Sequence, residues 1–79
     1  MSPTVLRVGP YRLFFFSNET GEPPHVHVQR ERMLAKLWLD PVGLARSTGF
    51  SPAELRRIQA IVMENRNTLL EAWHEYFTD

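Results

Sequence analysis

The chain lacks cysteine altogether, which excludes both a disulfide framework and a thiolate metal site. Its longest apolar run is too short to cross a bilayer and no secretory segment opens it, so a cytoplasmic location without a membrane partner is expected. Repeats, low-complexity tracts, Gly-rich phosphate loops and nucleophile motifs are also missing. What remains is a 79-residue chain with 43% apolar residues, which predicts one small folded domain over residues 1–79.

The chain also lacks an excess of charge of one sign, because it has nine basic and nine acidic residues. The two halves differ, however. Residues 1–39 hold five basic and three acidic residues, whereas residues 40–79 hold four and six. This mild polarity permits contact with nucleic acid without demanding it.

The first half of the chain carries the pattern of a β-sheet. Apolar and polar residues alternate, as they do in half-buried strands, and aromatic and β-branched residues are frequent. Gly9-Pro10 and Glu31-Arg32 are typical of tight turns, and residues 17–24 form a polar loop rich in turn formers. Four antiparallel strands are therefore predicted, at residues 5–8, 11–16, 25–30 and 33–39.

The second half, residues 40–79, predicts helices. Asp40-Pro41 is typical of an N-cap followed by proline in the first helical turn. A short helix is therefore expected to run through Leu44 and Ala45 and to end near Gly49, because glycine favours helix termination.

A longer helix is predicted after Ser51, which can cap it, with Pro52 in the first turn and Glu54 completing a capping box. Apolar residues then recur at helical spacing as far as residue 77. One long or bent helix over residues 52–77 is favoured over two. The expected fold class is α+β: a four-stranded antiparallel sheet followed by C-terminal helices packed on one of its faces.

The alternation divides the side chains of the sheet into two sets. The set expected to meet the helices is apolar throughout: Leu6, Val8, Leu13, Phe15, Val26, Val28, Met33, Ala35, Leu37 and Leu39. The opposite set mixes cations, imidazoles and aromatic rings: Arg7, Arg12, Phe14, Phe16, His25, His27, Gln29, Leu34, Lys36 and Trp38. Because exposed aromatic clusters mark binding surfaces, this second face is expected to be open and to bind a partner.

Three partners fit such a face. RNA would stack its bases on the aromatic rings while the cations contact phosphates. A cognate protein would bury the aromatic rings and pair with the cations. A second copy of this chain, held through Phe14, Phe16 and Trp38, is a variant of the same idea. The pattern favours a protein partner over nucleic acid.

His25 and His27 lie two residues apart on one predicted strand and therefore project from the same face. They are open to three interpretations: hydrogen-bonding strand residues, an acid and a base for metal-free RNA cleavage, or ligands of a metal such as zinc. A third metal ligand, at no diagnostic spacing, would have to be Glu19, Glu22, Asp40 or His74.

Several segments together resemble a small bacterial family, the domain of unknown function 4160. They are the stretches PTVLR from Pro3, YRLFFFSNE from Tyr11, PPHVHV from Pro23, LLEAW from Leu69 and EYF from Glu75. The proline–histidine stretch is the most specific of them. The chain departs from the family pattern at His74, where asparagine is expected, and this weakens any catalytic use of that residue.

The resemblance implies a component of a two-gene toxin–antitoxin module. A toxin of this size commonly acts on RNA, and a cognate protein encoded nearby would cover the same face. If the chain is an enzyme, a metal-independent ribonuclease with His25 and His27 as the catalytic pair is expected. No cofactor is expected, and no metal unless the histidine pair binds one. The expected binding residues are Arg7, Arg12, Phe14, Phe16, Gln29, Lys36 and Trp38.

Overall fold

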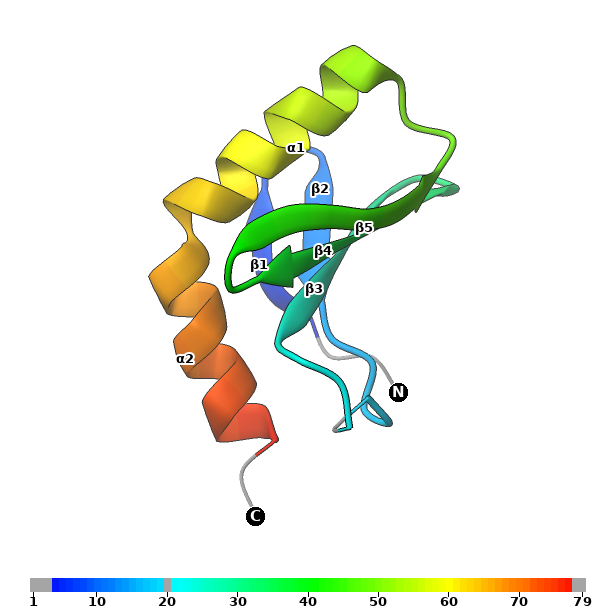
Figure 1. Ribbon diagram of the computed structural model, residues 1–79. Coiled ribbons are helices and arrows are strands. Elements are labelled where there is room, and N and C mark those ends of the chain that lie inside the picture. The colour runs from blue at the N-terminus through cyan, green and yellow to red at the C-terminus, as the bar shows by residue number, and fades with distance from the viewer. Residues whose placement is uncertain (1–3, 20, 78–79) are drawn as a thin grey trace.

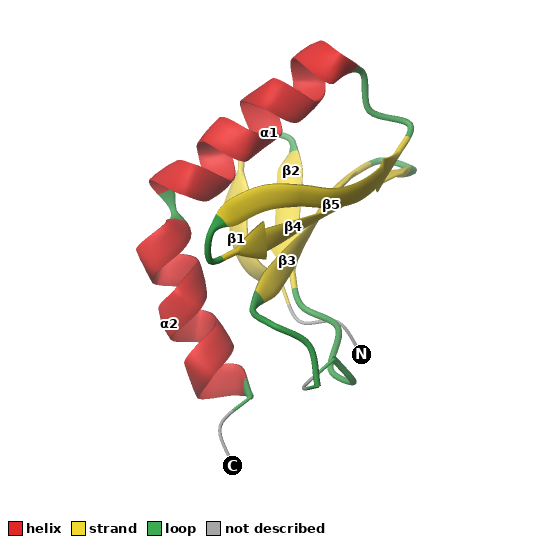
Figure 2. Ribbon diagram, in the orientation of Figure 1, coloured by secondary structure: helices red, strands yellow, loops and turns green. Residues whose placement is uncertain are grey.

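Five strands and two helices make up the fold in the computed structural model, which describes residues 4–19 and 21–77. Their order along the chain is five strands followed by two helices (Figures 1 and 2). The strands are β1 (Thr4–Val8), β2 (Tyr11–Phe14), β3 (His25–Arg30), β4 (Met33–Leu39) and β5 (Val42–Thr48). The helices are α1 (Pro52–Glu64) and α2 (Arg66–Tyr76).

The strands form one antiparallel sheet in which each strand pairs with its neighbours in the chain, in the order β1-β2-β3-β4-β5. The α+β class, the antiparallel sheet and the C-terminal helices are confirmed. The expected number of strands is wrong, because the sheet has five strands rather than four. Gly9 adopts a left-handed φ of 55° in the turn between β1 and β2, which glycine allows without steric cost.

The fifth strand occupies the segment that was expected to form a short helix. Asp40-Pro41, interpreted as a helix start, instead connects β4 to β5 through a cis peptide bond. Ala45 has no register partner, because the pairing of β4 with β5 shifts between Lys36 and Leu37. Such a bulge breaks the two-residue alternation by which a strand is recognised in a sequence. The expectation of a helix through Leu44 and Ala45 is therefore wrong.

The helical part consists of two helices that meet at Asn65, rather than the one long or bent helix expected from the sequence. Ser51 caps α1 as expected, with its Oγ accepting a hydrogen bond from the backbone N–H of Glu54 at 3.1 Å. At the junction, the side-chain Nδ2 of Asn65 donates to the carbonyl of Ile61 at 2.8 Å. Side-chain contacts of this kind compete with continued helix. Within the described ranges, neither helix is long and apolar enough to cross a membrane.

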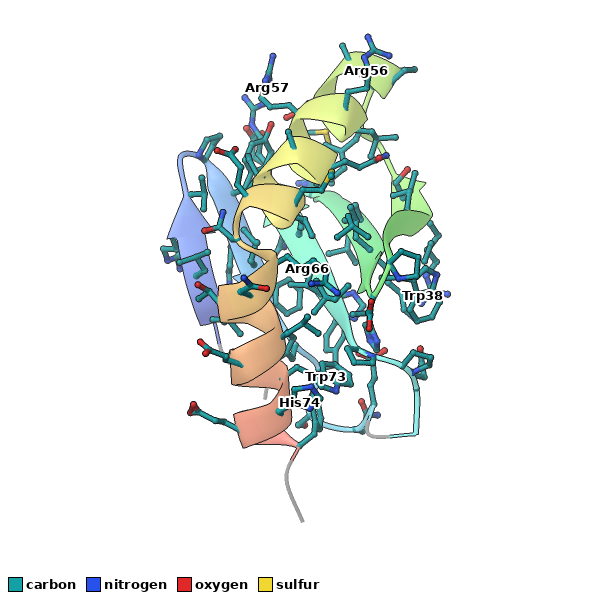
Figure 3. All side chains as sticks on the ribbon, turned by 60° about the vertical axis from the view of Figure 1, so that its left-hand side comes forward. Trp38, Arg56, Arg57, Arg66, Trp73 and His74 are labelled. Carbon is teal, nitrogen blue, oxygen red and sulfur yellow. The ribbon has the colours of Figure 1, made fainter. Side chains whose placement is uncertain are left out.

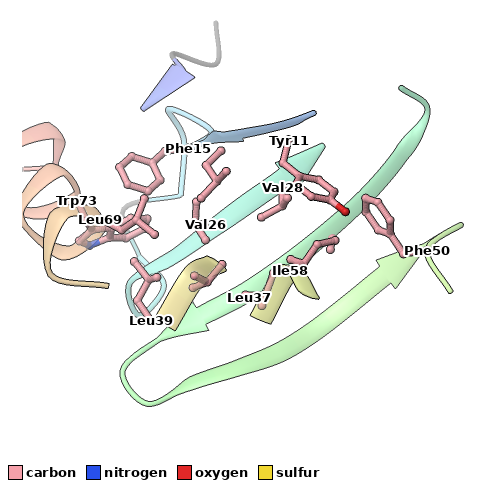
Figure 4. Packing of buried hydrophobic residues seen from close by; sticks show 13 residues of the cluster. Tyr11, Phe15, Val26, Val28, Leu37, Leu39, Phe50, Ile58, Leu69 and Trp73 are labelled. Atoms are coloured by element: carbon pink, nitrogen blue, oxygen red, sulfur yellow. The ribbon is translucent and has the colours of Figure 1, made fainter. Parts of the chain in front are cut away.

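The helices cover the apolar face of the sheet, as predicted. Side chains of α1 and α2 join those of the strands in one buried cluster (Figure 4). All ten residues of the predicted apolar set belong to this cluster or pack against it. Val26 and Val28 are 0% and 1% exposed, so the strand alternation of β3 is correctly assigned.

Two charged side chains, one on each helix, anchor the helices to the sheet. Glu54 at the start of α1 accepts hydrogen bonds from the hydroxyl of Tyr11 at 2.8 Å and from the guanidinium of Arg30 at 2.7 Å. These bonds lower the pKa of Glu54 below its usual value. Arg66 at the start of α2 donates to the carbonyl of Leu39 and to the carboxylate of Asp40, both at 2.8 Å. Figure 3 shows Arg66 extending toward the strands, whereas Arg56 and Arg57 project away from them.

Leu37 and Leu44 provide a test of β5, because they are directly paired across β4 and β5 but differ in burial, at 0% and 38% exposed. Leu37→Ala is expected to lower the free energy of unfolding by about 2–5 kcal/mol, because it leaves a cavity in the core. Leu44→Ala is expected to cost less than about 1 kcal/mol. Urea denaturation of both variants measures the difference, and equal losses would contradict the difference in burial between Leu37 and Leu44.

Candidate functional site

The face of the sheet opposite the helices is partly closed by the chain itself. The β2–β3 loop (residues 15–19 and 21–24) folds back over the side chains of β3 and β4. It is held there by side-chain contacts and by one backbone hydrogen bond, from the N–H of Leu39 to the carbonyl of Pro24 at 3.0 Å. The expected open face is therefore closed over its most reactive residues.

The predicted site residues divide into a covered and an uncovered group. His25, His27, Phe14 and Lys36 are covered, at 0%, 2%, 3% and 7% exposed, so the expectation that the histidine pair faces open solvent is wrong. Trp38, Gln29, Leu34 and Arg12 are half-buried, whereas Arg7 and Phe16 are exposed. Trp38 lies on the side of the strands away from the helices (Figure 3).

Glu19 of the β2–β3 loop is the centre of the covered group. Its Oε1 lies 2.8 Å from Nε2 of His25 and 2.9 Å from Nε2 of His27. One carboxylate oxygen is thus shared by both imidazoles. The strand alternation of β3 places the two rings on the same face, and the loop returns the carboxylate to them from six and eight residues earlier in the chain.

The side chain of His25 is fully buried among the described residues. Its Nδ1 lies 2.9 Å from the backbone carbonyl oxygen of Pro23. Its ring centroid lies 5.6 Å from that of Trp38 and 5.0 Å from that of Trp73 on α2. A carbonyl oxygen only accepts hydrogen bonds, so Nδ1 must carry a proton. In a neutral imidazole, Nε2 is then a bare lone pair that faces the carboxylate of Glu19.

In His27 the other ring nitrogen, Nδ1, is the one that lacks a favourable contact. Its ring stacks on Phe14 at 5.5 Å and meets the ring of Phe16 edge-on at 4.4 Å. Its Nδ1 is buried and has no hydrogen-bond partner. Burial lowers the pKa of His27 by more than the neighbouring Glu19 carboxylate raises it, so the neutral ring is favoured.

The carboxylate of Glu19 is ionised in this setting. Burial raises the pKa of Glu19, but the interactions with the two imidazoles outweigh burial, so its pKa lies below the usual value. The side chain is 15% exposed, which leaves it a narrow contact with solvent. The site therefore holds an anionic oxygen against two imidazole nitrogens.

A second ion pair fixes the same loop. Nζ of Lys36 donates to Oε1 of Glu22 at 2.5 Å and lies 4.8 Å from the ring centroid of Trp38. The hydrogen bond from Lys36 is the largest cause of the lowered pKa of Glu22. Lys36, predicted as a contact for an external anion, thus binds a carboxylate of its own chain.

Of the four candidate third ligands, the structure brings only Glu19 to both imidazoles. Glu22 comes no closer than 3.9 Å to His25 and is paired with Lys36. Asp40 is paired with Arg66, and His74 is exposed on α2 (Figure 3). One ligand atom each from Glu19, His25 and His27 lie within 4.8 Å of one another, close enough to hold one metal ion. The sequence contains no spacing signal that singles out Glu19, because its approach depends on the path of the loop.

Arg12 and Gln29 belong to a further set of side-chain contacts that spans β1, β2 and β3. The guanidinium of Arg12 donates to Oγ1 of Thr4 at 2.6 Å and to Oε1 of Gln29 at 3.1 Å. Its carbon Cζ lies 4.2 Å from the ring centroid of Phe14. Arg7 is the register partner of Arg12 on β1. Arg12 therefore braces neighbouring strands.

The lowered pKa of His27 predicts acid destabilisation of the metal-free protein. Above its usual pKa of about 6.5, His27 is neutral in both the folded and the unfolded chain. Below that value the unfolded chain gains a proton that the folded chain resists, so stability falls with pH. Glu19 adds a further loss as the pH falls from its usual pKa of about 4.5 through its lowered folded value.

Urea denaturation at a series of pH values measures this effect. The slope of stability against pH, just below the usual pKa of histidine, is expected to be shallower in His27→Gln than in the wild type. The exposed His74 of α2 provides the matched control, and His74→Gln is expected to keep the wild-type slope. Equal slopes in the wild type and in His27→Gln would show that burial of His27 has no such effect.

Comparison with known proteins places most of the chain in one family. A family model described as "Domain of unknown function (DUF4160)" matches residues 11–74, which include every strand but β1 and all three ligand candidates. Comparisons with curated proteins and with solved structures gave no significant match. The family resemblance is thus confirmed, but its description supports neither a toxin role nor RNA binding or cleavage.

Proposed function

The chain belongs to the DUF4160 family, whose description assigns no activity, and we propose from the site geometry that it is a metal-binding protein. One divalent ion of the zinc type would be held by Oε1 of Glu19 and by Nε2 of His25 and of His27. Two imidazoles and a carboxylate form a donor set that zinc accepts in proteins.

The contact between His25 and Glu19 carries the proposal. With Nδ1 committed to the carbonyl of Pro23, a neutral His25 directs a lone pair at a carboxylate oxygen 2.8 Å away. Two electron-rich atoms at that distance repel each other unless a positive species lies between them. A second proton on His25 is one solution, and a metal ion is the other. A metal-bound histidine usually donates its remaining N–H to a carbonyl or carboxylate, as His25 does to Pro23.

The two distances to Glu19 require a small adjustment on metal binding. Ligands about 2.0–2.2 Å from a tetrahedral zinc ion lie roughly 3.3 Å from one another. The carboxylate of Glu19 is 2.8 Å and 2.9 Å from the two Nε2 atoms, so it would move outward by about half an ångström. Glu19 stands on a loop and the histidines stand on β3, so the carboxylate is the ligand that moves. Three protein ligands leave a fourth position for water or another ligand.

The alternative expected from the sequence is acid–base cleavage of RNA. It requires that a substrate reach the same residues. A general acid and a general base must each come within hydrogen-bond reach of the substrate. At 0% and 2% exposed, His25 and His27 would meet RNA only after the β2–β3 loop has moved away. A metal ion can bind while the loop stays in place, and we therefore prefer the metal-binding role.

Zinc titration of protein purified without a histidine tag tests the proposal. Wild-type protein is expected to bind one equivalent, measured by isothermal calorimetry and by the absorption spectrum of the cobalt-substituted form. Glu19→Gln and His27→Ala are each expected to weaken binding at least about 100-fold, because each removes a direct ligand. His74→Ala is the matched control and is expected to bind as the wild type does.

Besides an absence of zinc binding by the wild type, two results would overturn the assignment. Zinc binding that survives in the double variant His25→Ala, His27→Ala would place the ion elsewhere. RNA cleavage by wild-type protein that persists in EDTA and is lost in the same double variant would favour the acid–base role instead. Circular dichroism of each variant shows whether the fold is retained.

A further inference from the structure

The last strand, β5, is an edge strand whose outer side is open. The sheet ends with β5, which pairs with β4 on one side only. In Figure 1 it lies in front of the other strands, with no described element over it. Outside the helices and strands, none of the backbone hydrogen bonds between described residues involves residues 42–48. An edge strand presents a row of unpaired N–H and C=O groups, so an extended segment can pair with β5.

Arg46 gives this edge a positive charge on the face of the sheet away from the helices. It is exposed and is the register partner of Lys36. Like charges at directly opposite positions of two strands destabilise the pair. Lys36 has a carboxylate partner in Glu22, but the described residues offer Arg46 no carboxylate within ion-pair distance. An acidic side chain opposite Arg46 on an added strand would supply one.

Gly43 leaves a gap on the same face of β5. It is the register partner of Trp38, and a Cβ at Gly43 would meet no atom within 4 Å, its chain neighbours apart. The half-buried indole of Trp38 is thus separated from the free edge by a residue without a side chain. An aromatic side chain on an added strand can cover a glycine at a sheet edge. At this position it would also cover the indole.

The bulge at Ala45 sets the spacing between the charge and the gap. Gly43 and Arg46 are three residues apart on β5, but their register partners on β4 are only two apart. A regular strand added on the other side would meet the two positions in the same way. In the antiparallel direction, which every pair in this sheet has, it would carry an acidic residue and, two residues later, an aromatic one. Bulges and charges discourage indiscriminate pairing at an edge, so this pattern is selective.

A second copy of the chain does not offer this pattern from its own free edges. Those edges are β1 and β5. Each carries an arginine, Arg7 on β1 and Arg46 on β5, and neither strand contains a carboxylate. Pairing of two such edges adds positive charge to positive charge. The charge of β5 therefore favours a strand from a different protein.

We infer that β5 is a docking edge for an extended, acidic segment of another protein, which joins the sheet as an additional antiparallel strand. Main-chain hydrogen bonds to β5 supply the affinity in this mode of binding, and side-chain contacts supply the selectivity. Here the selective contacts are made by Arg46 and by the gap at Gly43. Neither residue belongs to the proposed metal site, so the docking edge and the metal site stand or fall separately.

Binding of a fluorescein-labelled synthetic peptide, measured by fluorescence anisotropy in EDTA, tests the docking edge. The peptide is as long as β5 and alternates threonine with valine, except that glutamate and, two residues later, tryptophan replace two threonines. Replacing its glutamate by lysine is expected to weaken binding to the wild type at least about threefold, the scale of a cross-strand charge pair. Arg46→Glu is expected to reverse this preference. Arg56→Glu is the matched control, because Arg56 projects from α1 away from the strands (Figure 3).

Two N-methylated versions of the glutamate peptide test the backbone pairing itself. One is methylated on the nitrogens along one edge of the extended peptide, and the other along the opposite edge. Only one edge can pair with β5, so one version is expected to bind as the unmodified peptide does and the other is expected to lose binding. Equal behaviour of the two versions would overturn strand addition, as would an absence of binding by the unmodified peptide.

Two other occupants are outcomes of the same measurements. A dimer of the wild-type protein in sedimentation, dissociated by the glutamate peptide, would assign β5 to a second copy of the chain. Displacement of the labelled peptide by single-stranded RNA, stronger than by the unlabelled peptide at matched ionic strength, would assign it to nucleic acid. Either result would overturn the choice of an acidic protein segment and leave the metal site untouched.

Discussion

The fold depends at its centre on the removal of two imidazoles from water, where the carboxylate of Glu19 and the carbonyl of Pro23 are the polar groups that face them. Burial of polar groups is costly unless partners replace the lost water. Glu19 supplies the same oxygen to His25 and His27, and Pro23 supplies a carbonyl to the other nitrogen of His25. The β2–β3 loop is therefore attached to the sheet by polar contacts on one face, while the helices are attached by apolar contacts on the other.

The apolar side of the structure is the part that the sequence predicts well. A period of two along β3 and β4 assigns each side chain to a face, and a helical period after Ser51 indicates which residues pack over it. Both patterns arise from backbone geometry, so they are visible in a single chain. The strand at residues 42–48 is not predicted from these two patterns. Its bulge at Ala45 interrupts the alternation, and Asp40-Pro41 is equally suited to a turn and to a helix start.

The polar side is harder to predict, for a different physical reason. The alternation places His25 and His27 on one face but says nothing of what covers that face. Loop residues carry no periodic signal, so the return of Glu19 to the imidazoles and of Glu22 to Lys36 leaves no mark in the spacing. The residues that sequence analysis assigns to an external partner, Lys36 above all, are in part satisfied by this loop.

Trp38 of β4 and Trp73 of α2 reach the ring of His25 from two different elements, and the chain contains no other tryptophan. Both indole rings thus lie about 5–6 Å from the same imidazole, within the range at which aromatic rings interact. A protonated imidazole or a bound ion so close to an indole alters its emission. The intrinsic fluorescence of this protein is therefore a built-in optical probe of one histidine, and it needs no added label.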